Sequence, residues 1–231
     1  MTTYLNSDIT IDLRNGKTWR CYLEEYRHKR NFQPDKFCSY KAIALNEYMT
    51  KYNLSGVVLS VSGGVDSAVT LGLLKVAMDM ENSPITKIWA VSQPIHSSSW
   101  ALERAQELCA QFKIELINID QTDIHTSLTD KIKQETCIEA NKFSSGQLRS
   151  YMRTPVNYYM AQLLSQEGFP AVVIGTGNMD EDGYLAYFCK AGDGVVDIQL
   201  ISDLHKSEVY LLGQYLCVPD SILSAAPSAD L

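Results

Sequence analysis

The chain has 231 residues, a length that fits one sizeable domain or a domain with appendages. Hydrophobic residues make up 45% and charged residues 20%, as in ordinary globular proteins. The formal net charge of −7 argues against a general nucleic-acid surface, because nucleic acids recruit basic faces, although backbone N–H groups can still build a local phosphate site.

The sequence pattern of the first fifty residues predicts a short strand, a basic-aromatic segment and a helix. Residues 9–13 ("ITIDL") predict a short strand, and the basic-aromatic segment 26–32 ("YRHKRNF") predicts a solvated or interface face. Apolar residues recur at three- and four-residue steps from about 35 to 52, which predicts an amphipathic helix. We expect 1–50 to form a helical appendage within a single domain that spans 1–231.

From residue 56 onward, apolar strands alternate with amphipathic helices. Strands are predicted over 56–61, 87–92, 114–119 and 171–176. Helices are predicted over 67–80, 99–112, most of 122–168 with a polar loop at 141–147 ("NKFSSGQ"), and 206–216. This alternation indicates right-handed βαβ units. The predicted fold class is therefore α/β, a doubly wound parallel sheet with helices on both faces.

Two glycine-rich stretches follow predicted strands. They are "SGGVDS" (62–67) and "GTGN" (175–178), and both fall at the carboxyl edge of the sheet, where such folds bind ligands. In the first stretch, glycines let backbone N–H groups approach an anion at a helix N-terminus, and Ser62 and Ser67 can donate hydrogen bonds. Asp66 conflicts with an anion unless a cation such as Mg²⁺ bridges it to a polyphosphate. The spacing fits neither the Walker nor the dinucleotide fingerprint.

The first of these stretches resembles the SGGxDS loop of the ATP pyrophosphatase superfamily, whose fold is described as adenine nucleotide alpha hydrolase-like. The second half narrows the resemblance. "GTGNMDED", then "YFCKAGDGVVDIQLISDLHKSEV" and "PSADL" resemble the ammonia-dependent NAD synthetases, in order. "WALERAQEL" and "QLRSYMRT" are similar to the same family. The resemblance extends from about residue 20 to the last residue, and members of the family continue beyond "PSADL".

The resemblance implies a set of ATP-binding residues. Those expected to contact the nucleotide phosphates are Ser62, Gly63, Gly64, Asp66, Ser67, Thr176 and Lys206. Lys206 is expected to neutralise charge as pyrophosphate leaves, a role that suits a compact ammonium. Asp66 and Glu181 are expected to hold Mg²⁺. Asp182 is the competing ligand, because Glu181 lies one residue farther from Lys190 than is usual in the family.

The resemblance also implies contacts with the second substrate. Arg153 matches the last arginine of a family RxR pair, Tyr151 stands where the first is usual, and Arg149 is expected to supply that charge. Asp193 and Asp197 resemble the acidic pair near the nicotinate ring and the incoming ammonia, and are expected to be catalytic. Among the histidines, His205 is expected to be a surface residue at a helix start.

The implied activity is that of a C–N ligase. ATP adenylates the nicotinate carboxylate of deamido-NAD, and ammonia then displaces AMP to give NAD. The alternatives are another ATP pyrophosphatase of the GMP-synthetase or tRNA-modifying type, a non-catalytic nucleotide-binding module of the same fold, or an incomplete enzyme. The motifs leave no room for a glutaminase domain, so the expected nitrogen donor is free ammonia or ammonia from a separate glutaminase subunit.

Compartment and assembly follow from weaker signals. Residues 1–10 lack the features of a secretory signal, and no window approaches the ~18 apolar residues of a membrane span. The six cysteines include no CxxC pair, so we expect buried, reduced thiols. These features predict a cytoplasmic protein without membrane or nucleic-acid partners, and the resemblance implies a homodimer.

Overall fold

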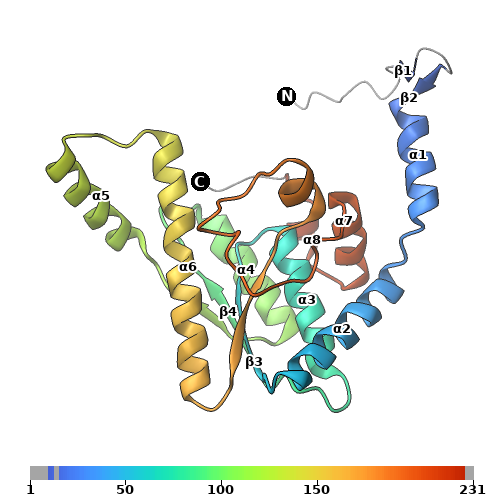
Figure 1. Cartoon of the computed structure of the whole chain (residues 1–231), viewed down its shortest axis with the longest axis horizontal. Helices are drawn as coiled ribbons and strands as arrows, with labels where there is room; N and C mark the ends of the chain where they lie inside the picture. The colour runs from blue at the N-terminus through green and yellow to red at the C-terminus, as the bar shows by residue number, and fades with distance from the viewer. Residues whose placement is uncertain (1–9, 13–15, 227–231) are drawn as a thin grey trace.

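The structure is a computed structural model that describes residues 10–12 and 16–226 (Figure 1). The motif "PSADL" lies outside the described residues. The strands are β1 (Thr10–Asp12), β2 (Lys17–Thr18), β3 (Gly56–Ser60), β4 (Lys87–Ser92), β5 (Leu116–Asn118), β6 (Ala171–Gly175) and β7 (Ile198–Gln199). The helices are α1 (Trp19–Arg30), α2 (Pro34–Lys51), α3 (Val65–Asp79), α4 (Ser99–Phe112), α5 (Thr122–Thr136), α6 (Lys142–Gln166), the π-helical turn η1 (Met179–Tyr184), α7 (Lys206–Tyr215) and α8 (Asp220–Leu223).

The central sheet has five parallel strands in the order β5-β4-β3-β6-β7. The chain moves outward from β3 through β4 to β5, then returns to place β6 on the other side of β3. That reversal is the switch point at which doubly wound sheets bind ligands, and the loops after β3 and β6 both open there. The predicted fold class is confirmed.

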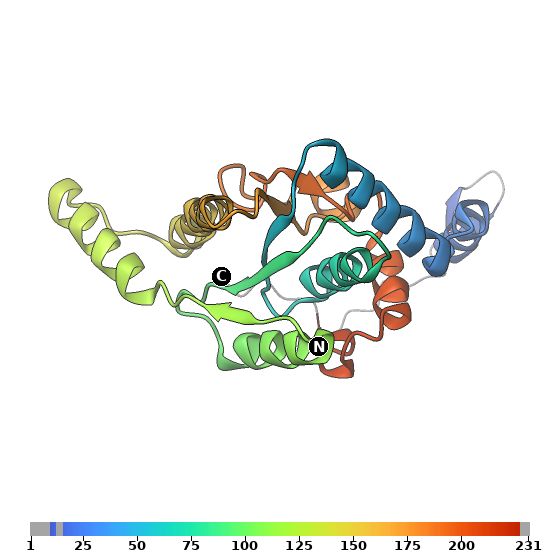
Figure 2. The ribbon, with the colours of Figure 1, turned by 90° about the horizontal axis from the view of Figure 1, so that it is seen from below.

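Helices cover both faces of the sheet (Figure 2). Alternate side chains of β3 point to opposite sides: Val57 and Leu59 join the larger core cluster, and Val58 joins the smaller one. The larger cluster contains residues of α2, α3, α4, α7 and α8. The smaller cluster is closed by α6, through Met160, Ala161 and Leu164. The central strand β3 is apolar over residues 56–59 because it is buried on both sides.

Some predicted boundaries are wrong, for local reasons. The segment 141–147 is not a loop: Asn141 accepts a hydrogen bond from the Ser144 N–H and caps α6, which begins at Lys142. The segment 26–32 agrees with its prediction as a solvated or interface face, because residues 26–31 are exposed; α1 extends through it to Arg30 and ends where Asn31 adopts a left-handed conformation. The strand expected over 114–119 is paired only over β5.

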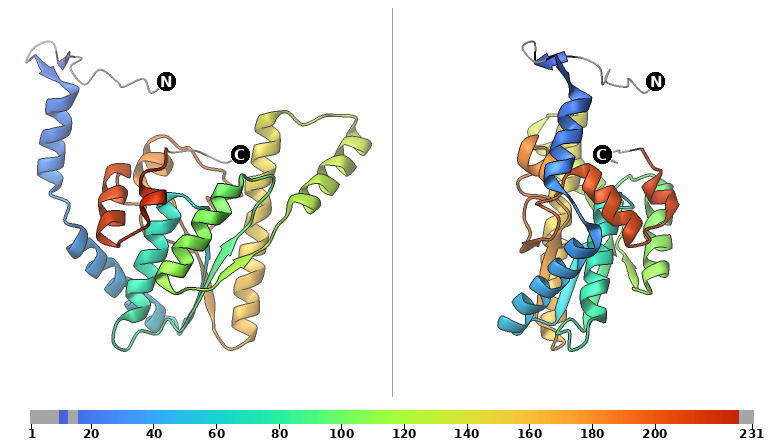
Figure 3. Two further views of the ribbon diagram at one scale, coloured as in Figure 1. Left: turned by 180° about the vertical axis from the view of Figure 1, so that it is seen from behind. Right: turned by 90° about the vertical axis from the view of Figure 1, so that its right-hand side faces the viewer.

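Helices α1 and α5 project from opposite ends of the molecule (Figures 1 and 3). Along α5, Ile124, Leu128 and Ile132 are exposed on one side of the helix. No helix in the described part of the chain is long and apolar enough to cross a membrane.

The expectation of uniformly buried thiols is only half right. All six cysteines are free, but the exposed ones are Cys21, Cys137 and Cys217.

Candidate active site

The loop after β3 folds back on itself through its two serines. The Ser67 hydroxyl donates to the Gly64 carbonyl oxygen at 3.0 Å and accepts from the Ser62 backbone N–H at 3.3 Å. Gly63 has φ +79°, and a Cβ there would lie 2.5 Å from the Ala101 carbonyl oxygen of α4. Only glycine fits this conformation and this close approach. The loop therefore holds its backbone at the N-terminus of α3, the arrangement that binds anions.

The loop after β6 is joined to Asp66 through Asn178. Asn178 is fully buried, and its Nδ2 donates to Asp66 Oδ1 at 2.9 Å. Its Oδ1 accepts from the backbone N–H groups of Asp180 and Glu181 at 3.1 and 3.0 Å, which caps η1. The amide side chain thus fixes the positions of Asp66 and Glu181 relative to each other.

Lys206 lies between these two acids. Its Nζ is 2.5 Å from Asp66 Oδ2 and 2.8 Å from Glu181 Oε1. The three side chains come from α3, η1 and α7, and each is only partly accessible. The structure therefore brings together three residues that the sequence placed in one ATP site.

Burial and neighbouring charge shift the pKa values of this cluster. Burial raises the pKa of Asp66, and the attraction of Lys206 only partly offsets it. Burial opposes the charge of Lys206, but Asp66 and Glu181 outweigh it and raise the Lys206 pKa. Burial, together with the charges of Asp193, Glu181 and Asp66, raises the pKa of Asp182 to about 6. The site is an acidic cluster that needs compensating positive charge.

The helix that carries Lys206 starts inside a network that sequence reasoning missed. Asp180 Oδ2 accepts the Lys206 backbone N–H at 2.8 Å, and Asp180 Oδ1 lies 2.7 Å from His205 Nδ1. Glu208 Oε2 accepts the His205 N–H at 2.9 Å in a capping box. His205 is therefore not merely a surface residue. The sequence contained one indication of this capping box, the Glu three positions after His205 in "HKSE".

The arginines expected near the second substrate lie on α6. Arg153 Nε donates to the carbonyl oxygen of Gln93, just after β4, at 3.3 Å. Arg149 is half-buried, and its Nε has no hydrogen-bond partner among the described residues. Tyr151, where the resemblance expects arginine, donates its hydroxyl hydrogen bond to Gln147. Arg153 thus lies beside the switch-point edge, and Arg149 offers an unused donor.

Asp193 and Asp197 occupy different environments. Asp193 Oδ1 accepts the Cys189 backbone N–H at 2.7 Å, and its charge acts on Asp182. Asp197 Oδ2 accepts the Val173 N–H at 2.8 Å, and its Oδ1 accepts the Tyr158 hydroxyl at 3.2 Å. The contacts of Asp197 join β6 to α6. Thr176 is half-buried directly after β6, at the edge where the glycine-rich loops meet.

Asp66 and Glu181 offer two carboxylate groups as ligands for a cation, but they do not form a closed cage. Within residues 10–12 and 16–226, no group of three or more His, Cys, Asp or Glu side chains forms a metal-binding cluster. Mg²⁺ is commonly held by one or two carboxylates plus substrate phosphates. The donor set fits a cation that arrives with a nucleotide.

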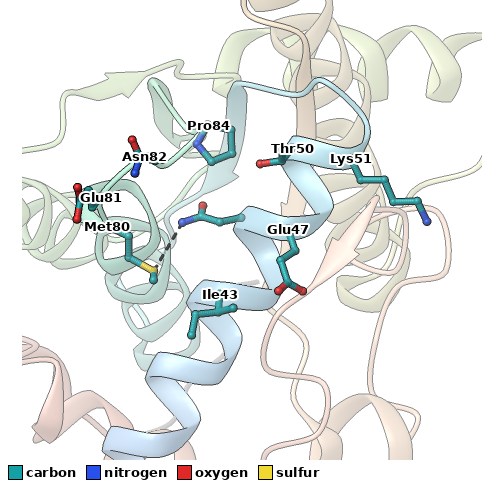
Figure 4. Close-up of a pocket in the computed structure, with 9 residues that line it drawn as sticks. Ile43, Glu47, Thr50, Lys51, Met80, Glu81, Asn82 and Pro84 are labelled. Carbon is teal, nitrogen blue, oxygen red and sulfur yellow. Dashed lines mark hydrogen bonds between the residues drawn. The ribbon is translucent and has the colours of Figure 1, made fainter.

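A hollow of about 400 Å³ lies away from this cluster, between the end of α2 and the α3–β4 connection (Figure 4). Ile43, Glu47, Met80 and Pro84 are among its lining residues. These segments precede β3 and β4, so the hollow lies at the amino-terminal edge of the sheet. No predicted site residue lines it.

The fold is an α/β fold of the ATP pyrophosphatase type, with an acidic, glycine-lined cluster at its switch point. A family model described as NAD synthase matches residues 38–231. The chain belongs to the NAD synthase family.

Individual relatives agree with that assignment. An NH(3)-dependent NAD(+) synthetase of Saccharolobus solfataricus is 38% identical over 187 residues, which cover 81% of this chain and 62% of the relative. One of Mesoplasma florum is 34% identical over 85% of this chain and 75% of the relative. The chain thus spans less than two thirds of the length of the first of these relatives.

Solved structures share the fold. An NMN synthetase from Francisella tularensis superposes with a TM-score of 0.75 at 29% identity, covering 85% of this chain and 76% of the other. An NH3-dependent NAD synthetase from Campylobacter jejuni superposes with a TM-score of 0.71, also at 29% identity, covering 84% and 77%.

Proposed function

We propose that the protein catalyses the ATP-dependent amidation of deamido-NAD to NAD, with ammonia as the nitrogen donor. The observation that carries this proposal is the convergence of Asp66, Glu181 and Lys206 between two glycine-rich loops at the switch point of the sheet. The relatives described as NH(3)-dependent NAD(+) synthetases support the choice of substrates.

The chain's own groups bind and orient ATP. Backbone N–H groups of the loop 62–67 and the Thr176 side chain contact the phosphates. Asp66 and Glu181 would hold Mg²⁺, which would supply charge neutralisation around the phosphates. Because Lys206 already contacts both carboxylates, its ammonium lies where it can neutralise charge on the departing pyrophosphate.

The reaction proceeds in two transfers. The nicotinate carboxylate oxygen bonds to the α-phosphorus of ATP as the bond from that phosphorus to the bridging oxygen breaks, and pyrophosphate leaves. Ammonia then bonds to the activated carbonyl carbon, AMP leaves and a proton is released. Arg149 and Arg153 bind the second substrate. Asp193 and Asp197 lie near the nicotinate ring and receive or steer ammonia.

A second candidate is amidation of the corresponding mononucleotide to NMN. The fold neighbour described as an NMN synthetase favours it, as does Tyr151 in place of an expected arginine, since a shorter substrate needs fewer cationic contacts. The two candidates share the ATP site and differ only in the acceptor.

The test is a pyrophosphate-release assay with ATP, Mg²⁺ and ammonia, run with deamido-NAD and separately with nicotinate mononucleotide. We expect release that depends on deamido-NAD and ammonia, with NAD as the product. Higher kcat/KM with the mononucleotide would favour the second candidate. If the protein bound ATP but released no pyrophosphate with either acceptor, it would be a non-catalytic nucleotide-binding module.

We further propose a cytoplasmic homodimer that takes free ammonia or ammonia from a separate glutaminase subunit. The exposed apolar residues Ile124, Leu128 and Ile132 on α5 support self-association. Light scattering after size exclusion measures the assembly, and a monomer at micromolar concentration would contradict the dimer.

A further inference from the structure

Helix α1 contacts the body of the protein at the start of α7, beside Lys206. The Tyr26 hydroxyl lies 2.7 Å from His205 Nε2, and the two rings meet edge to face with centroids 5.2 Å apart. One turn later, Arg30 donates from Nε and Nη2 to the two carboxylate oxygens of Glu208, at 2.7 and 3.0 Å. Arg30 Nη2 also donates to the Asp203 carbonyl oxygen at 2.5 Å. The beginning of α1, by contrast, projects away from the body (Figures 1 and 3).

A hydrogen-bonded path leads from Tyr26 to the backbone of Lys206. One neutral tautomer of His205 satisfies both of its ring contacts, because Nδ1–H donates to Asp180 while Nε2 accepts from the Tyr26 hydroxyl. The other oxygen of Asp180 accepts the Lys206 N–H. The same Asp180 lies in η1 beside Glu181, so the path joins two of the three elements that form the acidic cluster.

The contact of Arg30 secures the next turn. Glu208 is 5% exposed, and a carboxylate buried to that degree needs a cation partner. Arg30 supplies it in the bidentate geometry that a guanidinium offers. Glu208 in turn accepts the His205 N–H. Arg30 thereby holds the end of α1 against the first turn of α7.

We propose that Tyr26 and Arg30 are positioning residues for Lys206. Together with His205, Asp180 and Glu208 they form the α1 clamp, which fixes the first turn of α7 and with it the reach of the Lys206 side chain. A lysine has a long, flexible stem, so a fixed backbone is needed to keep its ammonium in register with a transferring phosphate. This inference rests on the proposed function. Both residues precede residue 38, where the family match begins.

Two conservative variants test the clamp in the whole chain. Tyr26→Phe removes only a hydroxyl, and Arg30→Lys keeps the charge but loses the bidentate contact. Tyr22→Phe and Arg27→Lys, on the same helix, are matched controls. Hydrogen–deuterium exchange at the His205 and Lys206 amides is the first measurement. We expect exchange about three- to tenfold faster in the test variants, the equivalent of one net hydrogen bond, and unchanged in the controls.

Steady-state kinetics is the second measurement. We expect Tyr26→Phe to lower kcat about three- to tenfold while KM for ATP stays within about twofold, because ground-state binding does not use this contact. In a Lys206→Gln background the same change should have no further effect on kcat. A merely structural residue would lower kcat equally in both backgrounds.

The outcomes separate the clamp from the proposed function. Unchanged amide exchange in both test variants would overturn the clamp, as would an equal kcat loss with and without Lys206. Equal effects of Tyr22→Phe and Tyr26→Phe would also overturn it. If the wild-type protein formed no amide product, the proposed function would fail, and amide exchange alone would then support or overturn the clamp.

Discussion

Replacing Lys206 by glutamine removes the positive charge from the acidic cluster and keeps a side chain of similar length. Asp66 and Glu181 then lose contacts of 2.5 and 2.8 Å. Burial continues to disfavour the ionised form of Asp66, so its pKa, already raised, rises further without Lys206. The variant therefore holds uncompensated negative charge at the carboxyl edge of the sheet.

The cost in stability follows from the exposure of the three side chains. Removing one partner of a fully buried ion pair costs about 3–5 kcal/mol, whereas an exposed pair contributes about 0–1 kcal/mol. The side chains of Lys206, Asp66 and Glu181 are 23%, 19% and 38% exposed. We therefore expect an intermediate loss of about 2 kcal/mol, which lowers Tm by roughly 4–8 °C in a chain of this size.

The cost in activity is larger. Loss of one preorganised charge that stabilises the transition state lowers kcat by roughly 10²–10³-fold. Thermal unfolding and pyrophosphate release measure the two effects. Lys75→Gln is the control, because Lys75 pairs with the exposed Asp79 one turn along α3 and its loss should cost less than about 0.5 kcal/mol.

The pH dependence of the stability loss adds a second check. In the variant the folded pKa of Asp66 lies above its unfolded value, so stability declines as pH rises through the folded pKa. At low pH, where the carboxylates are protonated, variant and wild type should converge. Wild-type Tm at every pH, together with a kcat within threefold of wild type, would refute the assignment of Lys206 to the site.

Three further predictions concern neighbouring features. Asp66→Asn keeps the side-chain shape but removes a carboxylate from the proposed magnesium site, so we expect at least a roughly hundredfold loss of kcat and weaker Mg²⁺-dependent nucleotide binding by calorimetry; wild-type binding and turnover would contradict that role. Gly63→Ala places a Cβ 2.5 Å from the Ala101 carbonyl oxygen at φ +79°, so chemical denaturation should show a loss of more than about 1 kcal/mol, whereas exposed Gly16→Ala should cost less. His125 is 4% exposed, and neither ring nitrogen has a hydrogen-bond partner among the described residues. Because burial and the charges of His96 and Arg149 lower its pKa, the free energy of unfolding should be highest above about pH 6.5 and decline as pH falls below that value. His125→Phe should flatten that decline.

The larger part of the fold could be predicted from the sequence. The run 87–92 and the helix 99–112 were placed at their observed bounds, because hydrophobic periodicity reports burial directly. The strand β7 was not predicted, since a strand of two residues carries no readable period. The start of α6 was misplaced because Asn141 can begin either a loop or a helix, and tertiary packing decides between them.

The candidate site could be predicted only as separate motifs. The glycine-rich loop after the first core strand indicated Asp66, and the family resemblance indicated Glu181 and Lys206. Their joint contact and the role of Asn178 as a link depend on chain packing that no local pattern encodes. The contacts of Tyr26 and Arg30 could not be predicted for the same reason, because their partners lie more than 170 residues farther along the chain.

The order of strands in the sheet has a consequence for how the protein folds. Asp66 meets Asn178 across 112 residues of sequence and Lys206 across 140. Pairing parallel strands across such distances loses the entropy of closing long loops before the strand contacts contribute any stabilisation. Such pairing therefore forms slowly. During synthesis, β3 and β4 can pair while β6 is still unmade. The proposed nucleotide site is therefore complete only once the C-terminal third of the chain has docked. Until then, an incompletely synthesised chain exposes the apolar side of β3.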